Sequence, residues 1–295
     1  SGDNNTAVGF DSLKANTTGS SNTGMGNNAL GANTTGASNV GIGSGSLDAN
    51  TEGDANTAVG ASAYTTGTTG IQNTAIGRSA LSANTTASGN VAVGAFSLQT
   101  NTEGFSNVAI GTCQPSGYGA ALEVNTTGDC NVAVGNGALR SNTTADNNTA
   151  VGTLASGCNT TGTNNVAVGK TALQANTTGG SNVAMGRDAL KANTTAALNT
   201  AVGDCALQAN TTGDINAAFG AYALKFNTTG AANTAVGKNS LQANTTAGSN
   251  TAVGYNSLTA NTTGGDNVAM GVNALLSNTT GSSNVAIGAT ALDAN

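Results

Sequence analysis

The chain contains no histidine and no tryptophan, and only 7% of its 295 residues are charged. Without histidine it has no histidine-based catalytic triad, general base or metal ligand. Its carboxylates form no recurring pair, and the sequence has neither the Gly-Gly-x-Gly-x-Asp pattern of calcium-binding repeats nor a phosphate-binding glycine loop. We therefore predict that the protein is not an enzyme and uses no metal or cofactor.

Basic residues are also scarce: there are eight, against fourteen acidic residues, for a net charge of −6. No basic stripe is present to neutralise phosphates, so nucleic acid is not an expected partner. No run of 18 apolar residues occurs, so no membrane-inserted segment is expected. Low charge with 38% hydrophobic residues also argues against a solvated disordered chain.

One short pattern, Asn-[Thr/Val]-Ala-[Val/Ile/Met]-Gly, recurs through the whole chain. Its seventeen copies are spaced by 17 residues, with one interval of 24. The copies begin at Asn5, Asn22, Asn39, Asn56, Asn73, Asn90, Asn107, Asn131, Asn148, Asn165, Asn182, Asn199, Asn216, Asn233, Asn250, Asn267 and Asn284. A fixed period is typical of stacked repeat architectures. We number each repeat from its first Asn, as positions 1 to 17.

The full repeat reads N-[TV]-A-[VIM]-G-x-x-[AS]-L-x-x-N-T-[TE]-[GA]-x-x. The Asn and Gly residues favour turns and interrupt any helical pattern, whereas Thr, Val and Ile favour strands. We predict an all-β protein: a parallel β-solenoid, or β-roll, of 17 coils in a single repeat array over residues 1–295. Each coil is expected to hold two short strands, at positions 1–4 and about 8–11.

Stacking places equal positions above one another, which assigns a role to each row. The Asn residues at positions 1 and 12 are expected to form hydrogen-bonded ladders. Position 4 and the Leu of position 9 are expected to face the interior, and the Gly of position 5 is expected to have a positive φ. All eight basic residues fall at position 6 or 10, which fits a solvated rim.

The strand at positions 2–4 is apolar or uncharged on both faces, with Ala or Gly at position 3 in every copy. A strand of this kind is usually buried on both faces. One face can line the coil, and the other then needs a cover, most simply another copy of the chain. The alternative is that Ala merely fits a narrow coil.

The interval of 24 residues reflects a loop insertion at about 113–119, which contains the chain's one proline. A loop at one place on a solenoid can mark a binding face. A tolerated surface loop explains it equally well. Cys113 and Cys130 flank this coil and are a candidate disulfide pair.

The triplet Asn-Thr-Thr is an N-glycosylation acceptor pattern. Its candidate acceptors are Asn16, Asn33, Asn84, Asn125, Asn142, Asn159, Asn176, Asn193, Asn210, Asn227, Asn244, Asn261 and Asn278. Glu52 and Glu103 break the triplet but leave the Asn of position 12, which favours the ladder as the primary role. Threonine rows also suggest ice binding, although neighbouring Thr residues point to opposite sides and only one row would face out.

Residues 107–111 and 284–288, both Asn-Val-Ala-Ile-Gly, resemble the head repeats of YadA-like trimeric autotransporter adhesins and similar phage tail-fibre repeats. The period is longer here than in that family. The resemblance implies a left-handed parallel β-roll, a trimer of chains side by side, and a location on the cell surface or a virion fibre. It transfers no ligand-binding residue.

Two functions are therefore expected. The first is a structural or adhesive extracellular fibre that associates with itself side by side, with a head-to-tail filament as a further option and surface or matrix glycans as candidate partners. The second is a monomeric ligand-binding solenoid that binds ice or glycans.

Overall fold

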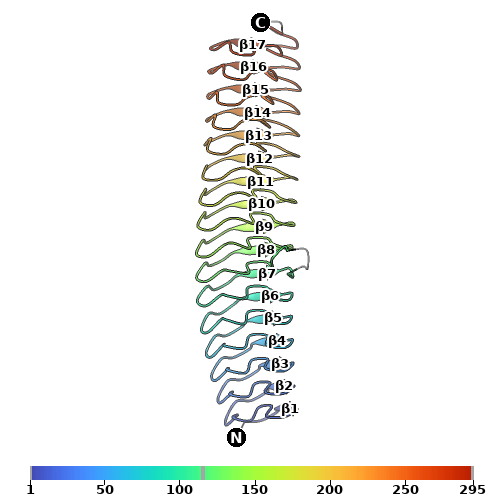
Figure 1. The fold of residues 1–295 in the computed structure, drawn as a ribbon, viewed down its shortest axis with the longest axis vertical. Coiled ribbons are helices and arrows are strands. Elements are labelled where there is room, and N and C mark those ends of the chain that lie inside the picture. The colour runs from blue at the N-terminus through green and yellow to red at the C-terminus, as the bar shows by residue number, and fades with distance from the viewer. Residues whose placement is uncertain (1, 114–116, 294–295) are drawn as a thin grey trace. The chain divides into compact units, whose positions relative to one another are not determined.

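The computed structural model describes residues 2–113 and 117–293, and the chain divides into two compact units, Ser1–Asn148 and Thr149–Asn295. Within each unit the backbone winds in repeated coils, with one three-residue strand per coil (Figure 1). All the regular elements of the described residues are β-strands. The predicted parallel β-solenoid is confirmed. That residues 1–295 form a single repeat array stays a prediction.

Each strand occupies positions 2–4 of its repeat. In unit 1 the strands are β1 (Thr6–Val8), β2 (Thr23–Met25), β3 (Val40–Ile42), β4 (Thr57–Val59), β5 (Thr74–Ile76), β6 (Val91–Val93), β7 (Val108–Ile110) and β8 (Val132–Val134). In unit 2 they are β9 (Thr149–Val151), β10 (Val166–Val168), β11 (Val183–Met185), β12 (Thr200–Val202), β13 (Ala217–Phe219), β14 (Thr234–Val236), β15 (Thr251–Val253), β16 (Val268–Met270) and β17 (Val285–Ile287).

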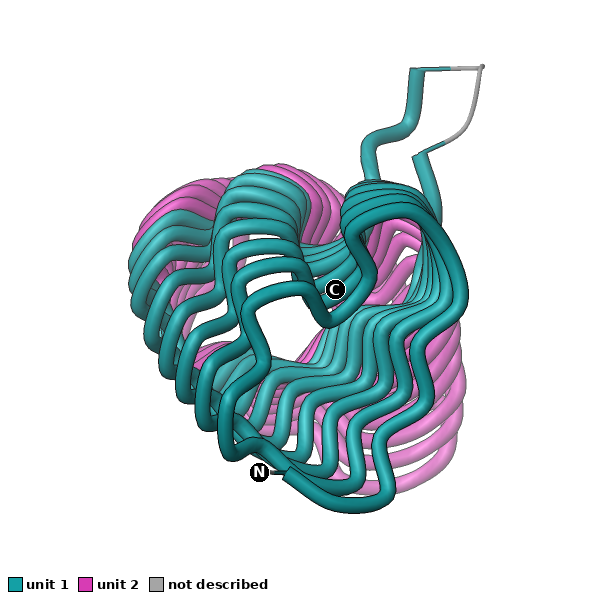
Figure 2. The backbone as a smooth tube through the Cα atoms, turned by 90° about the horizontal axis from the view of Figure 1, so that it is seen from below, with its two compact units in different colours: residues 1–148 teal, residues 149–295 magenta. Residues whose placement is uncertain are grey.

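Successive strands pair in parallel, and each residue lies opposite its equivalent in the next repeat. Thr6 pairs with Thr23 in unit 1, and Val166 pairs with Val183 in unit 2. The insertion does not disturb this register, because Val108 of β7 still pairs with Val132 of β8. The flanking residues 112–113 and 117–119 lead away from the outline of unit 1 (Figure 2). Residues 114–116 of the predicted loop lie outside the described residues.

The predicted second strand at positions 8–11 is wrong. In the coil of β11, Asp188 at position 7 and Leu190 at position 9 have φ values of 57° and 49°, and the same two positions are left-handed in the other coils that lack the insertion. A left-handed residue cannot continue an extended strand. Positions 6–12 therefore turn the chain, while the amide of Leu190 still bonds to the carbonyl of Ala206 in the next coil.

The interior is lined by positions 1, 3, 8, 9, 12 and 15. Ala184 of β11 is fully buried, whereas Met185 is 42% exposed, and the other strands between β2 and β16 show the same pattern. Leu at position 9 faces inward as predicted, but the expectation that position 4 faces inward is wrong. The two Asn rows share the interior with Leu190 and Ala189, so the inward-facing residue of the strand is the small one.

The Gly of position 5 ends each strand with a positive φ, as predicted, and Gly186 has a φ of 135°. This is a conformation that residues with a Cβ avoid. A Cβ on Gly186 would also lie 2.4 Å from the carbonyl oxygen of Gly203 in the next coil. The row of glycines thus allows neighbouring coils to approach closely where the chain leaves the strand.

Candidate interaction surface

The two predicted Asn ladders are confirmed in the interior of both units. In the position 12 row, the side-chain amide of Asn193 donates to Oδ1 of Asn176 at 2.9 Å and to the carbonyl of Ala196 at 3.0 Å. In the position 1 row, Oδ1 of Asn182 accepts the backbone amide of Asn199 at 3.0 Å. The rungs of both rows therefore bond one coil to the next.

The candidate glycosylation sites lie in one of these ladders. Asn16 is half-buried, and the other twelve are buried: Asn33, Asn84, Asn125, Asn142, Asn159, Asn176, Asn193, Asn210, Asn227, Asn244, Asn261 and Asn278. A glycan attaches to the side-chain nitrogen, which in Asn193 is enclosed and donates two hydrogen bonds. Glycosylation stays a prediction, and this burial argues against it in the folded chain.

One coil of unit 1 shows how tightly the interior space is shared. Tyr64 replaces Leu at position 9, and its hydroxyl accepts a hydrogen bond from Asn73 at 3.0 Å. Gly67 replaces Asn at position 12, where a Cβ would lie 2.1 Å from the Tyr64 ring. Burial raises the pKa of Tyr64 to about 12. The missing rung leaves Oδ1 of Asn50 buried without a hydrogen-bond partner in the protein.

Ser156 is the other exception at position 9, and we expect Ser156→Leu to stabilise unit 2. The Ser156 side chain is buried, and its Oγ has no hydrogen-bond partner. Leucine would fill a place that it holds in fifteen of the seventeen repeats. It would also remove the unpaired hydroxyl, so we expect a gain of about 2 kcal/mol in the free energy of unfolding, measured with urea.

The reverse change, Leu173→Ser in the next coil, serves as the control and is expected to cost about 2–5 kcal/mol. A Ser156→Leu variant less stable than the parent chain would show that the coil around Ser156 has closed over the missing side chain.

The outer face of the sheet is an uncharged surface that the repeat creates. We define it in each unit as the side chains of positions 2 and 4. Position 2 is Thr, Val or Ala, and position 4 is Val, Ile, Met or Phe, with no charged residue in either row. Position 4 remains well exposed, as in Met25 at 41% and Met185 at 42%. Apolar surface in continuous rows of this kind commonly marks an interaction site.

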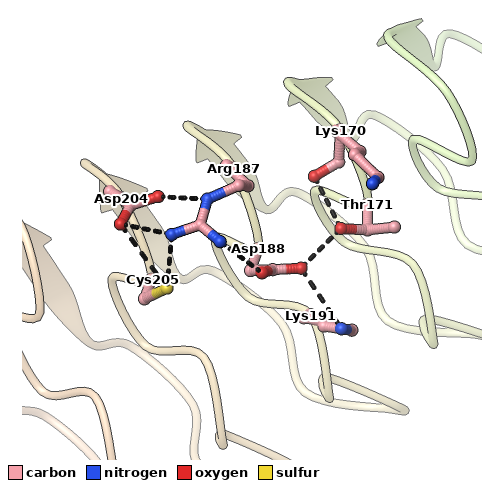
Figure 3. A network of polar contacts seen from close by, with 7 residues as sticks. All are labelled: Lys170, Thr171, Arg187, Asp188, Lys191, Asp204 and Cys205. Carbon is pink, nitrogen blue, oxygen red and sulfur yellow. Dashed lines mark hydrogen bonds and ion pairs between the residues drawn. The ribbon is translucent and has the colours of Figure 1, made fainter.

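Charged residues lie at the corner that follows this face. Arg187 at position 6 donates two hydrogen bonds of 2.8 Å to the carboxylate of Asp204 in the next coil (Figure 3). The hydrogen bond from Arg187 is the main cause that lowers the pKa of Asp204. Asp188 accepts a hydrogen bond from Thr171 and ion-pairs with Lys191 at 3.2 Å. These charges bond to one another at the corner and leave the outer face uncharged.

The threonine rows differ in what they offer to a ligand. At position 13, Thr177 donates its hydroxyl to the carbonyl of Thr194 in the next coil at 3.1 Å. At position 14, Thr178 and its equivalents are exposed. Position 13 is half-buried in most repeats and exposed at Thr17, Thr85 and Thr279, so the expectation that only one row faces outward is not confirmed; position 14 is the more exposed row. Binding of ice or glycans by that row stays a prediction.

The predicted disulfide joins two exposed residues. Cys113 precedes the insertion, and Cys130 is at position 17 of the same repeat, where its amide donates to the carbonyl of Phe105 at 3.0 Å. Their pairing stays a prediction. Of the other two cysteines, Cys205 is buried, and burial raises the pKa of its thiol.

Among the described residues, no group of three or more Cys, Asp or Glu side chains lies close enough together to hold a metal ion. No helix in that part of the chain is long and apolar enough to cross a membrane.

The outer face is formed by positions 2 and 4 of each strand, whereas position 4 is expected from the sequence pattern to face the interior. The signal for the observed arrangement was present in position 4, where Phe219 and Met185 are too large for an interior that accepts only Ala or Gly beside them. The eight Thr residues at position 2 alternate with position 3 and so share the face of position 4. Their hydroxyls also suit solvent better than an apolar interior.

The coil, its Asn ladders and its uncovered face define the protein as a parallel β-solenoid built from tandem repeats. Comparison of the sequence with protein-family models and with curated proteins finds no match. The similarity to YadA-like head repeats therefore stays a prediction that depends on the motif itself.

Proposed function

We propose that the protein is a structural fibre component whose units associate side by side through the outer face of the sheet. The observation that supports this most is the pair of uncharged rows at positions 2 and 4. Burying large side chains such as Met185 and Phe219 against a partner contributes about 1.5–3 kcal/mol for each one fully covered. Many equal rows add such contributions along a stack.

A second copy of the chain is the best match for this face. Side chains recur along it at the spacing of paired strands, about 4.7–4.9 Å. A partner that stays in contact over many coils needs the same spacing, and another stack of the same coils has it. The corner charges Arg187 and Asp204 are already paired with each other and need no charged partner.

The extracellular location and the adhesive role belong to the same proposal. Their support is the resemblance of Asn-Val-Ala-Ile-Gly to the heads of YadA-like adhesins, which also favours three chains and contact with surface or matrix glycans. The solenoid itself supplies rigidity and length. We propose no catalytic role for it.

The test measures the mass of the full chain in solution by analytical ultracentrifugation and its shape by electron microscopy. We expect a mass that is a multiple of the chain mass, and thin rods or filaments. Three lysines placed on the outer face of unit 2 are expected to give monomers, because each buried charge is costly. The substitutions are Val168→Lys, Met185→Lys and Val202→Lys.

The control places three lysines in the same three coils but on the exposed row of position 14, with the same change in net charge. It is expected to keep the mass of the parent protein. Its substitutions are Thr178→Lys, Thr195→Lys and Thr212→Lys. A parent protein that sediments as a monomer would falsify the proposal, and so would a control that dissociates as readily as the outer-face variant.

A further inference from the structure

The coil that contains β13 carries unusual residues at both positions of the outer face. Ala217 is the one alanine at position 2, and Phe219 is the one phenylalanine at position 4, among all seventeen repeats. The smallest residue of one row and the largest residue of the other thus lie on the same strand and the same face. Neither change is needed by the interior, where Ala218 is buried as in the other coils.

The residues on either side make these two exceptions visible as surface relief. We call the space over Ala217 the dent and the Phe219 side chain the bump. Ala217 pairs with Thr200 and Thr234 on either side, so its row is lower at this coil. Phe219 is 42% exposed although it is the largest side chain of its row.

The row of position 4 is correspondingly higher at this coil. Phe219 pairs with Val202 and Val236, which are both shorter side chains. The dent and the bump are therefore at one level of unit 2.

Symmetry relates the dent and the bump of neighbouring copies. Homo-oligomers are mostly closed by rotation. When the rotation axis runs along the stack, position 4 of one copy meets position 2 of its neighbour at the same coil. This holds for two chains or for three. A reversed copy would instead bring position 4 opposite position 4, and each coil opposite a different coil.

We infer that Phe219 of one copy fills the space over Ala217 of the next, and that this contact fixes the axial register of parallel copies. The inference rests on the proposed function, because it needs the outer faces to meet. The other coils of unit 2 present similar Thr, Val, Ile or Met rows, so a slip by one coil changes their contacts little. At the coil of β13, a slip places Phe219 against a Thr and leaves the dent empty.

The test uses the full chain with Ala217→Val or Phe219→Val, both outward-facing changes to a residue that other repeats carry in the same row. Each variant alone is expected to associate about 10-fold more weakly than the parent, since the first fills the dent and the second removes the bump. The double variant, which has the Val-Val pair of β10, is expected to associate more strongly than Ala217→Val but without a fixed register. Thr234→Val in the next coil is the control and is expected to associate like the parent.

Mixing separates contacts between copies from effects within one copy. Ala217→Val keeps the bump and Phe219→Val keeps the dent, so an equal mixture restores one good contact at each mixed interface. With one variant carrying a mass tag, native mass spectrometry is expected to show mixed oligomers in about 10-fold excess over random assortment.

Random assortment in an oligomeric mixture would overturn the register contact while leaving the proposed association intact. A clash between the introduced valine and Phe219 inside one chain predicts that same random result, so the mixture decides between the two explanations. A monomeric parent protein would instead overturn the proposed function, and the register contact with it. Thermal unfolding of each variant confirms that the coils themselves are unchanged.

Discussion

Replacing Asn193 by aspartate is expected to lower the free energy of unfolding by about 4 kcal/mol or more at pH 7. Asn193 is fully buried in the position 12 ladder and donates to Asn176 and to the carbonyl of Ala196. Aspartate has nearly the same shape but brings a charge, and its oxygens face two acceptors. The Asn210 amide that bonds to Asn193 Oδ1 at 3.0 Å cannot compensate for both losses.

Urea unfolding at several pH values checks this prediction. Burial raises the pKa of a carboxyl group above its ordinary value of about 3.9, so the variant folds best with the group neutral. Its stability is then present below pH ~3.9 and is lost as the pH rises through the folded-state pKa. Asn164→Asp is the matched control, since Asn164 is exposed at position 17, and should change stability by no more than about 0.5 kcal/mol. Equal effects of the two substitutions would refute the ladder as a source of stability.

Gly186→Ala is expected to cost roughly 3–5 kcal/mol, although it adds one methyl group. The φ of 135° is unfavourable for alanine, and the new Cβ would lie 2.4 Å from the Gly203 carbonyl oxygen. Neighbouring coils would have to separate to accept it, which weakens the backbone hydrogen bonds on both sides. Thermal or urea unfolding measures the loss.

Gly265→Ala makes the same chemical change at position 16 of unit 2. A Cβ there has one neighbour within 4 Å, at 3.3 Å, and the backbone has no positive φ. Other repeats carry Ala197 and Ala231 at this position. We expect a change of no more than about 0.5 kcal/mol. If Gly186→Ala were tolerated equally well, the close approach of the coils would not depend on glycine.

The rows that could be predicted from sequence are those where one chemical requirement decides the residue. Asn at positions 1 and 12 is buried and polar. A ladder is the simplest way for a stack of coils to provide hydrogen-bond partners for its side-chain amide. Gly at position 5 has no substitute in any repeat. Charges at positions 6 and 10 exclude those positions from the interior. Each of these predictions needed only the type of residue and the period.

Which face of the strand points into the interior could not be predicted in this way. It depends on how much space the side chains of the other positions leave there. The interior already holds two Asn rows and Leu190, and the remaining space accepts Ala184 but not Met185. The left-handed backbone conformation of Leu190 could not be predicted either, since leucine rarely adopts it. Position 7 did carry a signal: Asn, Asp, Ser and Gly recur there, and all of them are common in turns.

The Asn residues of the ladders donate toward one neighbouring coil and accept from the other. This uniform direction has a consequence for how the number of repeats in a gene can change. In the position 12 row, Asn193 donates to the coil before it and accepts from the coil after it, so successive coils present the same two surfaces. Even the longer repeat keeps this match, because the side-chain amide of its Asn125 still donates to Oδ1 of Asn101 at 2.8 Å. Duplication or deletion of one repeat's codons would therefore change the number of coils without requiring a new interior. The number of coils therefore follows the number of repeats in the gene, and selection can change it by one whole repeat at a time.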